Sequence, residues 1–120
     1  MRSIVVVDDY APFRLVVREM LERDGFRVVG EASDGDAAVD AVRMLRPDIV
    51  LLDVHLPGDD GFTVCERLQR LVPIPRVVLT SSHDVASFRR RLQTSPARGF
   101  ISKADLTSAA LVAVLEARPL

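Results

Sequence analysis

The sequence predicts an α/β fold in which five helices cover both faces of a doubly wound, five-stranded parallel sheet. Two observations predict this fold. Short apolar runs rich in β-branched residues alternate along the 120 residues with longer segments whose apolar residues recur at helical spacing. Several of the short runs contain no polar residue, which is typical of strands buried on both faces of a parallel sheet. Crossovers of this length between parallel strands are right-handed, so successive helices can cover both faces.

The first third of the chain predicts a strand, a helix and a second strand. Ile4–Val7 is an apolar run that ends in two carboxylates, Asp8 and Asp9. Gly25 ends the following helix, and Phe26–Val29 begins the second strand. The buried side of the helix is expected to consist of Phe13, Val16, Val17, Met20 and Leu21. This order of elements is the repeating unit of a parallel sheet.

The middle of the chain centres on a strand of four apolar residues. A turn at Ser33–Gly35 leads into a helix that Pro47 ends. The strand Ile49–Leu52 follows and ends at Asp53, at an edge where open parallel sheets bind ligands. The buried side of the helix before it is expected at Ala38, Ala41, Val42 and Leu45.

A third helix and a fourth strand come next. Asp60 is the expected N-cap of the helix, and Pro73 marks its end. The apolar residues of this helix are Val64, Cys65, Leu68, Leu71 and Val72. The strand Arg76–Thr80 follows. Beyond it, Ser81–Pro96 has only a thin apolar stripe beside three arginines, so we expect the fourth helix to be the least firmly held.

The chain closes with a short strand, Gly99–Ser102, and a helix over Leu106–Ala117 with Asp105 or Thr107 as its N-cap. Residues 109–115 include no polar side chain, although a helix on a sheet needs only one apolar stripe. The residues expected to meet the sheet are Leu106, Ala110, Ala113 and Ala117. Three larger residues would then face away from it: Leu111, Val114 and Leu115. They predict an interface with a second copy of the chain or with another domain; the alternative is scattered exposed apolar residues, which are normal.

Composition limits the class of protein. A formal net charge of -1 gives no bulk attraction to nucleic acid, and 5% aromatic residues disfavour binding of single strands by stacking. Cys65 is alone, which excludes an internal disulfide and a multi-cysteine zinc site. The N-terminal apolar run is too short for a signal peptide or a membrane span. We therefore expect one soluble, cytoplasmic domain without membrane association.

Polar residues follow the strands that should share one edge of the sheet. They are Asp8, Asp9, Asp53, Thr80 and Lys103. Three neighbouring carboxylates repel one another unless a cation neutralises them, and oxygen ligands favour a hard cation such as Mg²⁺. A hydroxyl and an ammonium beside them offer donors to the oxygens of a phosphoryl group. The set predicts phosphoryl transfer.

Other candidate sites are weaker. The chain contains neither a phosphate-binding P-loop nor a GxGxxG dinucleotide fingerprint. His55 and His83 have no companion at metal-ligand spacing and are expected in loops. Cys65 lies on the apolar side of its helix and is expected in the core. Arg89–Arg91 is expected to be a solvated face, with a partner-binding site as the alternative.

Four segments together resemble the receiver domains of bacterial two-component response regulators. They are VVVDDY, IVLLDVHLPGDDG, VVLTSS and GFISK, in the family's order and spacing. The segments GFRVVGEASDG and LPGDDGF are similar to the NarL/FixJ branch, whose members usually carry a C-terminal helix-turn-helix. The resemblance implies a flavodoxin-like strand order of 2-1-3-4-5 and a receiver domain over residues 1–120. DNA would be bound only through an output domain outside this chain.

The resemblance also implies a role for each residue at the strand ends. Asp53 would accept a phosphoryl group from the phosphohistidine of a sensor histidine kinase. Asp9 would bind Mg²⁺ directly, and Asp8 would bind it mainly through water. Asp53 and the backbone carbonyl of His55 would complete the protein ligands of the metal.

By the same resemblance, Thr80 and Lys103 would hold the phosphoryl oxygens, and Phe100 would change rotamer as Thr80 moves. The chain departs from the family at two positions. Ala104 stands where a proline after a cis peptide bond is most common, and a cis bond before a non-proline residue costs about 2.5–4 kcal/mol. The Lys103–Ala104 bond is therefore either trans or strained. Ser81 stands where alanine or glycine is common.

Three functions remain open from the sequence. The leading one is a phosphorylation-controlled switch that regulates transcription through an output domain; it would not be a turnover enzyme, although it would catalyse its own phosphorylation and dephosphorylation. A Mg²⁺-dependent phosphatase is disfavoured, because His55 occupies the position of the second aspartate that such an enzyme needs. An interaction module without phosphorylation is disfavoured because every site residue is present.

Overall fold

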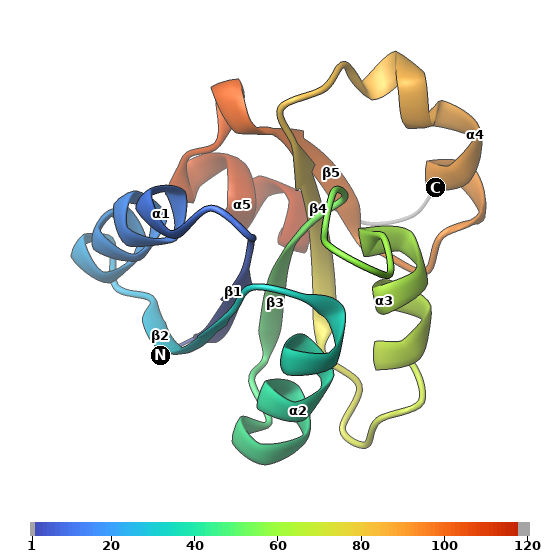
Figure 1. The fold of residues 1–120 in the computed structure, drawn as a ribbon. Helices are drawn as coiled ribbons and strands as arrows, with labels where there is room; N and C mark the ends of the chain where they lie inside the picture. Colours follow the sequence, from blue (N-terminus) through green and yellow to red (C-terminus); the bar gives the residue numbers. More distant parts are fainter. Residues whose placement is uncertain (1, 118–120) are drawn as a thin grey trace.

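Five parallel strands form one sheet in the computed structural model, which describes residues 2–117. The strand order is β2-β1-β3-β4-β5, and every neighbouring pair is parallel (Figure 1). The strands are β1 (Ser3–Val7), β2 (Arg27–Ala32), β3 (Ile49–Asp53), β4 (Arg76–Ser81) and β5 (Gly99–Ser102). The predicted five-stranded, flavodoxin-like sheet and its strand order are confirmed.

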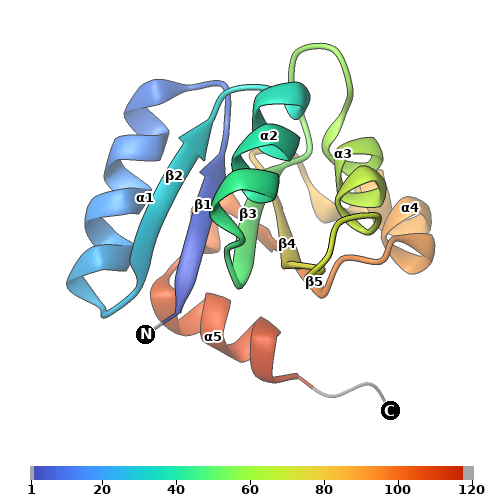
Figure 2. The same cartoon turned by 90° about the horizontal axis from the view of Figure 1, so that it is seen from below.

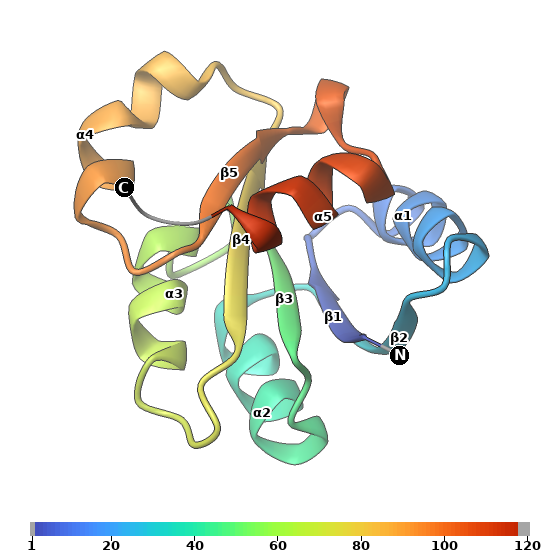
Figure 3. The ribbon, with the colours of Figure 1, turned by 180° about the vertical axis from the view of Figure 1, so that it is seen from behind.

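Helices cover both faces of this sheet (Figures 2 and 3). The helices are α1 (Ala11–Arg23), α2 (Gly35–Leu45), α3 (Gly61–Leu68), α4 (Arg89–Thr94) and α5 (Ser108–Glu116), with 3-10 turns at Val85–Phe88 and Lys103–Asp105. On one face, Leu21 of α1 and Leu111 of α5 pack in a buried cluster with the inward side chains of the strands. On the other face, Val42 of α2 and Leu68 of α3 do the same. The sheet is therefore the middle layer of three.

The central strands are buried on both sides. All five residues of β1 and all five of β3 are buried, which explains why these segments are continuously apolar in sequence. Cys65 is buried in the cluster under α2 and α3, as predicted. Burial raises the pKa of its thiol to about 11. No helix within residues 2–117 has the length and apolar character that a bilayer crossing requires.

Side-chain caps begin α2, α3 and α5, and at the start of α2 the Asp34 carboxylate accepts a hydrogen bond from the Ala37 N–H. The Asp60 carboxylate accepts a hydrogen bond from the Thr63 N–H at the start of α3, as predicted. At the start of α5, the Thr107 hydroxyl accepts a hydrogen bond from the Ala110 N–H. Thr107, rather than Asp105, is therefore the N-cap of the last helix.

Several predicted boundaries and faces were wrong in detail. In α1, Val16 is 64% exposed, because a stripe centred on Val17 and Leu21 already covers the sheet. In α3, the helix ends at Leu68, and Val72 is 89% exposed. A residue before proline is disfavoured in the helical conformation, so the helix ends ahead of Pro73. The second strand begins at Arg27 and extends to Ala32, three residues beyond the predicted end.

The predicted orientation of the last helix was wrong for its leucines and for Ala113, whereas Leu106 and Ala110 pack against the core as expected. Leu111 and Leu115, expected to face away from the sheet, are 0% and 4% exposed and belong to the core under α1 and α5. Ala113, expected against the sheet, is exposed. Two leucines bury more apolar area than alanines do, so the helix turns its leucine stripe inward. Leu111→Glu would thus place a charge in the core and could not test a surface interface.

The Lys103–Ala104 peptide bond is trans. Within residues 2–117, the cis peptide bond is at Val72–Pro73. The strained alternative considered from the sequence does not occur.

Candidate functional site

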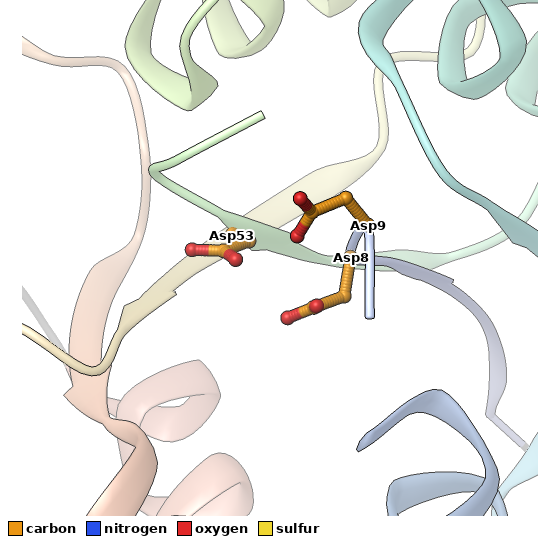
Figure 4. A group of neighbouring side chains, drawn as sticks. All are labelled: Asp8, Asp9 and Asp53. Atoms are coloured by element: carbon orange, nitrogen blue, oxygen red, sulfur yellow. The ribbon is translucent and has the colours of Figure 1, made fainter. Parts of the chain in front are cut away.

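Three carboxylates meet at the carboxyl edge of the sheet (Figure 4). Asp8 and Asp9 follow β1, and Asp53 is the last residue of β3. Each offers an oxygen that lies within 4.8 Å of those of the other two. Asp8 and Asp53 are 0% and 4% exposed, whereas Asp9 is exposed. The structure thus brings together the three acidic residues that the sequence predicted at this edge.

Strand pairing explains why these residues meet. Val7 pairs with Leu52 across β1 and β3, so the next residues, Asp8 and Asp53, leave adjacent strands at the same level. Asp53 in turn pairs with Thr80 at the end of β4. The cluster is therefore a direct result of parallel register.

Gly61 lets the loop after Asp53 fold back closely on the strand end. Its N–H donates to the Val54 carbonyl at 2.7 Å. A Cβ at this position would collide with the backbone oxygen of Asp53 and lie 2.7 Å from Val54 Cα. A side chain other than hydrogen would therefore push the loop away from the site.

Lys103 brings the ammonium to this edge. Its Nζ lies 2.7 Å from Asp8 Oδ2 and 3.2 Å from Asp53 Oδ2. The Asp53 contact is a hydrogen bond, whereas the Asp8 contact lacks hydrogen-bond geometry and is an ion pair. Burial alone would lower the pKa of Lys103, but the two carboxylates outweigh burial and raise this pKa above its ordinary value. The lysine is thus held as a cation between both acids.

Asp53 is a carboxylate in a poorly solvated position. Burial raises the pKa of Asp53 above its ordinary value, and the neighbouring charge of Asp8 acts in the same direction. The His55 N–H, which donates to Asp53 Oδ1 at 3.1 Å, and the Lys103 ammonium oppose the rise. Asp53 therefore gains from any additional positive charge that approaches it.

Thr80 lies beside this cluster at the end of β4, and Phe100 lies on the neighbouring strand β5. Thr80 is 1% exposed, and its Oγ1 finds no hydrogen-bond partner among residues 2–117. Phe100 is half-buried; its ring lies 6.1 Å from that of Phe88. It lines a cleft of about 650 Å³ together with residues that follow β4, among them Ser82 and His83. A buried hydroxyl without a partner is costly, so Thr80 is ready to donate to a new acceptor.

The three carboxylates fit a hard divalent cation. They present only oxygen ligands, and Mg²⁺ is held by one or two carboxylates together with water and phosphate oxygens. Asp8 Oδ1 already accepts a hydrogen bond from the Tyr10 N–H at 2.9 Å, so this side chain is fixed in position. Asp9 is exposed and free to approach an ion. The residues present therefore suit the Mg²⁺ that the sequence predicted.

Two side-chain contacts near the site were not predicted from the sequence. Lys103 Nζ lies 4.3 Å from the centroid of the Phe13 ring, although Phe13 was assigned only to the core. The rings of His55 and His83, which lie in loops as predicted, have centroids 4.2 Å apart. The strand topology could have predicted that the two histidines are neighbours, because each lies two residues after the end of one of two adjacent strands, β3 and β4.

The arginine segment belongs to α4 rather than to the carboxylate cluster. Arg91 pairs with Asp60 at 2.8 Å and lies 4.3 Å from the centroid of the Phe62 ring. Arg89 and Arg90 are exposed, as expected of a solvated face. Arg91 therefore connects α4 to the start of α3.

The fold and this edge together define a class of protein: a flavodoxin-like domain with an acidic triad and a lysine where its parallel strands end. The chain belongs to the response regulator receiver domain family, whose model matches residues 4–116. It is accordingly a phosphoacceptor domain of two-component signalling.

Individual relatives agree with this family. The chain is 38% identical over 113 residues to a putative transcriptional regulator of Pseudomonas aeruginosa, covering 94% of this chain and 55% of the relative. It is 35% identical over 101 residues to the virulence transcription regulator BvgA of Bordetella pertussis, covering 84% of this chain and 48% of BvgA. The chain thus spans about half the length of these two relatives.

Among solved structures, the signal receiver domain of the putative response regulator NarL from Mycobacterium tuberculosis is 35% identical. The match has a TM-score of 0.82 and covers 97% of this chain and 98% of that domain. This likeness supports the NarL/FixJ-like branch that the sequence predicted.

Proposed function

We propose that Asp53 accepts a phosphoryl group from the phosphohistidine of a sensor histidine kinase, in a step that requires Mg²⁺. One observation carries this proposal: Asp53 is a buried strand-end carboxylate that lies beside two other acids and is in direct contact with the Lys103 ammonium. A cytoplasmic location follows from this choice of partner.

In the proposed transfer, an Asp53 carboxylate oxygen forms a bond to phosphorus as the N–P bond of the phosphohistidine breaks. The electron pair of the broken bond stays on the imidazole nitrogen of the kinase. Lys103 and the unpartnered Thr80 hydroxyl then bind the phosphoryl oxygens, which places a cation and a donor where negative charge accumulates.

The metal ligands we propose are Asp9 directly, Asp8 mainly through water, Asp53, and the backbone carbonyl of His55. Bound Mg²⁺ would supply the positive charge that neutralises the carboxylates and the phosphoryl oxygens. The difference between Asp8 and Asp9 is supported by their burial, because Asp8 is fully buried and engaged by Lys103 whereas Asp9 is exposed.

We further propose that phosphorylation changes the conformation of the region after β4. Thr80 would move toward the phosphoryl group, and Phe100 would turn into the space that it leaves. The output would be transcriptional regulation through a DNA-binding domain outside this chain, by analogy with the longer regulators that it resembles. Self-association through the last helix stays a prediction, but its exposed face consists of small residues such as Ala109 and Ala113.

The experiment is intact-mass measurement after incubation with Mg²⁺ and acetyl phosphate. The wild type should gain the mass of one phosphoryl group, and Asp53→Asn should gain none. Asp9→Ala should stay folded and lose Mg²⁺ binding to a greater extent than Asp8→Ala. A labelled peptide that maps elsewhere in a folded protein would refute the assignment of Asp53. Equal Mg²⁺ affinity in wild type and Asp9→Ala would refute the proposed ligand.

The alternative that the chain is a Mg²⁺-dependent phosphatase is tested by assaying the wild-type protein for hydrolysis of small phosphate esters. A phosphatase would turn over small phosphate esters, whereas a switch would release only the phosphate that it carries. His55 offers an imidazole in place of the carboxylate that a phosphatase needs at that position, which favours the switch.

A further inference from the structure

The ring of Phe13 faces the ammonium of Lys103. The distance from Nζ to the ring centroid is 4.3 Å, well within the range of a cation–π interaction. Phe13 lies near the start of α1 and is partly buried, packed against the core under α1 and α5. Because the side chain of Lys103 is only 19% exposed, water competes weakly for this contact.

The ring is fixed to the same loop that carries Asp8. The Tyr10 N–H donates to Asp8 Oδ1, and the Phe13 N–H donates to the Tyr10 carbonyl at 3.1 Å. Arg14, the next residue of the helix, donates from its guanidinium to the backbone carbonyl of Asp8. The ring and the Asp8 carboxylate therefore hold Lys103 from one rigid unit.

The other contacts of the ammonium are with groups that have a second use. Asp8 Oδ2 and Asp53 Oδ2 both contact Nζ, and both belong to the triad suited to a divalent cation. When these oxygens take a metal ion or a phosphoryl group, the ammonium must leave at least one of them. The Phe13 ring, which offers no competing ligand atom, is the contact that can persist.

We propose that Phe13 is a positioning residue: its ring keeps the Lys103 ammonium at the mouth of the site while the lysine exchanges a carboxylate for a phosphoryl oxygen. This inference rests on the proposed role of Lys103 in holding the phosphoryl group. Without the ring, the flexible lysine side chain samples more rotamers, and fewer of them point at the reacting group.

The test uses three variants. Phe13→Leu removes the aromatic face and keeps an apolar side chain, whereas Phe13→Tyr keeps the face. Met20→Ala is the matched control, because Met20 is also partly buried in the same core and lies two turns further along α1. If Phe13 acted only as packing, Met20→Ala would disturb the site as Phe13→Leu does.

The first readout needs no phosphorylation. In the NMR spectrum of the metal-free protein, the ε-methylene protons of Lys103 should be shifted upfield by the ring in wild type, Phe13→Tyr and Met20→Ala. The shift should vanish in Phe13→Leu. An unshifted Lys103 signal in the wild type would overturn the proposal.

The second readout is the rate of phosphorylation by acetyl phosphate with saturating Mg²⁺. Phe13→Leu should be about 3- to 10-fold slower than wild type, as expected from the loss of one cation–π contact. Phe13→Tyr and Met20→Ala should react at close to the wild-type rate. An unchanged rate in Phe13→Leu, or an equal loss in Met20→Ala, would overturn the proposal. If the wild type itself takes up no phosphate, the proposed function fails, and the NMR readout alone decides whether Phe13 positions Lys103.

Discussion

The centre of the sheet and the segment around α4 border the same site but are held in different ways. Every residue of β1 and β3 is buried, whereas α4 contributes no buried residue of its own. Contacts of Phe88 and Leu92 with the core hold the α4 segment from beneath, and the Arg91 ion pair with Asp60 holds it from the side. Segments with few buried contacts open at low free-energy cost. The acidic residues are thus built on the firmly packed part of the protein, and the loosely packed part follows Thr80.

The largest expected effect tests the rigid part. Leu111→Ala should lower the free energy of unfolding by about 2–5 kcal/mol, because it empties a fully buried site. Leu92→Ala, in the half-buried stripe of α4, should cost about 1 kcal/mol. Urea unfolding of both variants measures the difference. Equal losses would mean that α4 is as firmly packed as the sheet.

A smaller effect is expected where the rigid strand end meets its loop. Gly61→Ala should destabilise the protein by about 1–3 kcal/mol, because the new methyl group collides with backbone atoms of Asp53 and Val54. Gly58→Ala is the control: its φ of 79° makes a side chain strained, but nothing lies within 4 Å of the added Cβ. The melting temperature should fall further in Gly61→Ala than in Gly58→Ala. The reverse order would contradict the close approach of position 61 to the backbone of Asp53 and Val54.

Arg91→Ala should cost about 1 kcal/mol, because it removes a partly exposed ion pair and a contact with the Phe62 ring. The loss should be local: amide hydrogens of α4 should exchange faster while those of β1 and β3 keep their wild-type protection. Arg90→Ala, which changes an exposed neighbour, should leave both sets unchanged. Faster exchange throughout the sheet would show that the two regions are not separate.

The smallest effect is a contrast in pH dependence between the two regions. Burial raises the pKa of Asp53 in the folded protein above the ordinary aspartate value of the unfolded chain. Between these two pKa values the unfolded chain loses its proton first, so the metal-free folded protein becomes less stable as the pH rises through this window. Asp53→Asn should therefore gain stability relative to wild type above that window and not below it. The comparison requires a chelator, since a bound cation would reverse the effect.

Asp60 should respond in the opposite direction. Burial alone would raise its pKa, but the Thr63 N–H and the Arg91 guanidinium outweigh burial and lower it. The stability that Asp60 contributes is present above the ordinary aspartate pKa and is lost as pH falls through the lowered one. Asp60→Asn should therefore lose stability near neutral pH and differ little from wild type in strong acid. The measurement is the free energy of unfolding of Asp53→Asn and Asp60→Asn, relative to wild type, across the acid range. If the two variants differed from wild type in the same direction, this contrast would be contradicted.

Much of the site could be predicted because it depends on backbone topology. Strands as apolar as Ile49–Leu52 can only be central, and a parallel sheet must bring Asp8, Asp53 and Lys103 to one edge. The orientation of α5 could not be predicted in this way. Its sequence is apolar all round, so periodicity did not choose a face, and only the volumes of Leu111 and Leu115 decided it.

Contacts between side chains of distant elements were also beyond the sequence. The ring of Phe13 under Lys103 and the pairing of Arg91 with Asp60 depend on rotamers, which no spacing rule encodes. The tilted contact between the rings of His55 and His83 lies between these cases. Strand register predicts that they are neighbours, but not that their rings touch.

The Asp60 carboxylate divides its two oxygens between two elements: Oδ1 caps α3, and Oδ2 pairs with Arg91 of α4. The cap partner is a backbone N–H, which every residue except proline supplies at position 63, whereas the pairing partner is a side chain that evolution can replace. Positions 60 and 91 should therefore covary among relatives, while position 63 should drift freely. A lineage that replaces Asp60 by serine or asparagine keeps its helix start but loses the ion pair with Arg91. The contact with the Phe62 ring is then the remaining constraint on this arginine, so the α4 surface is freer to specialise for a different partner.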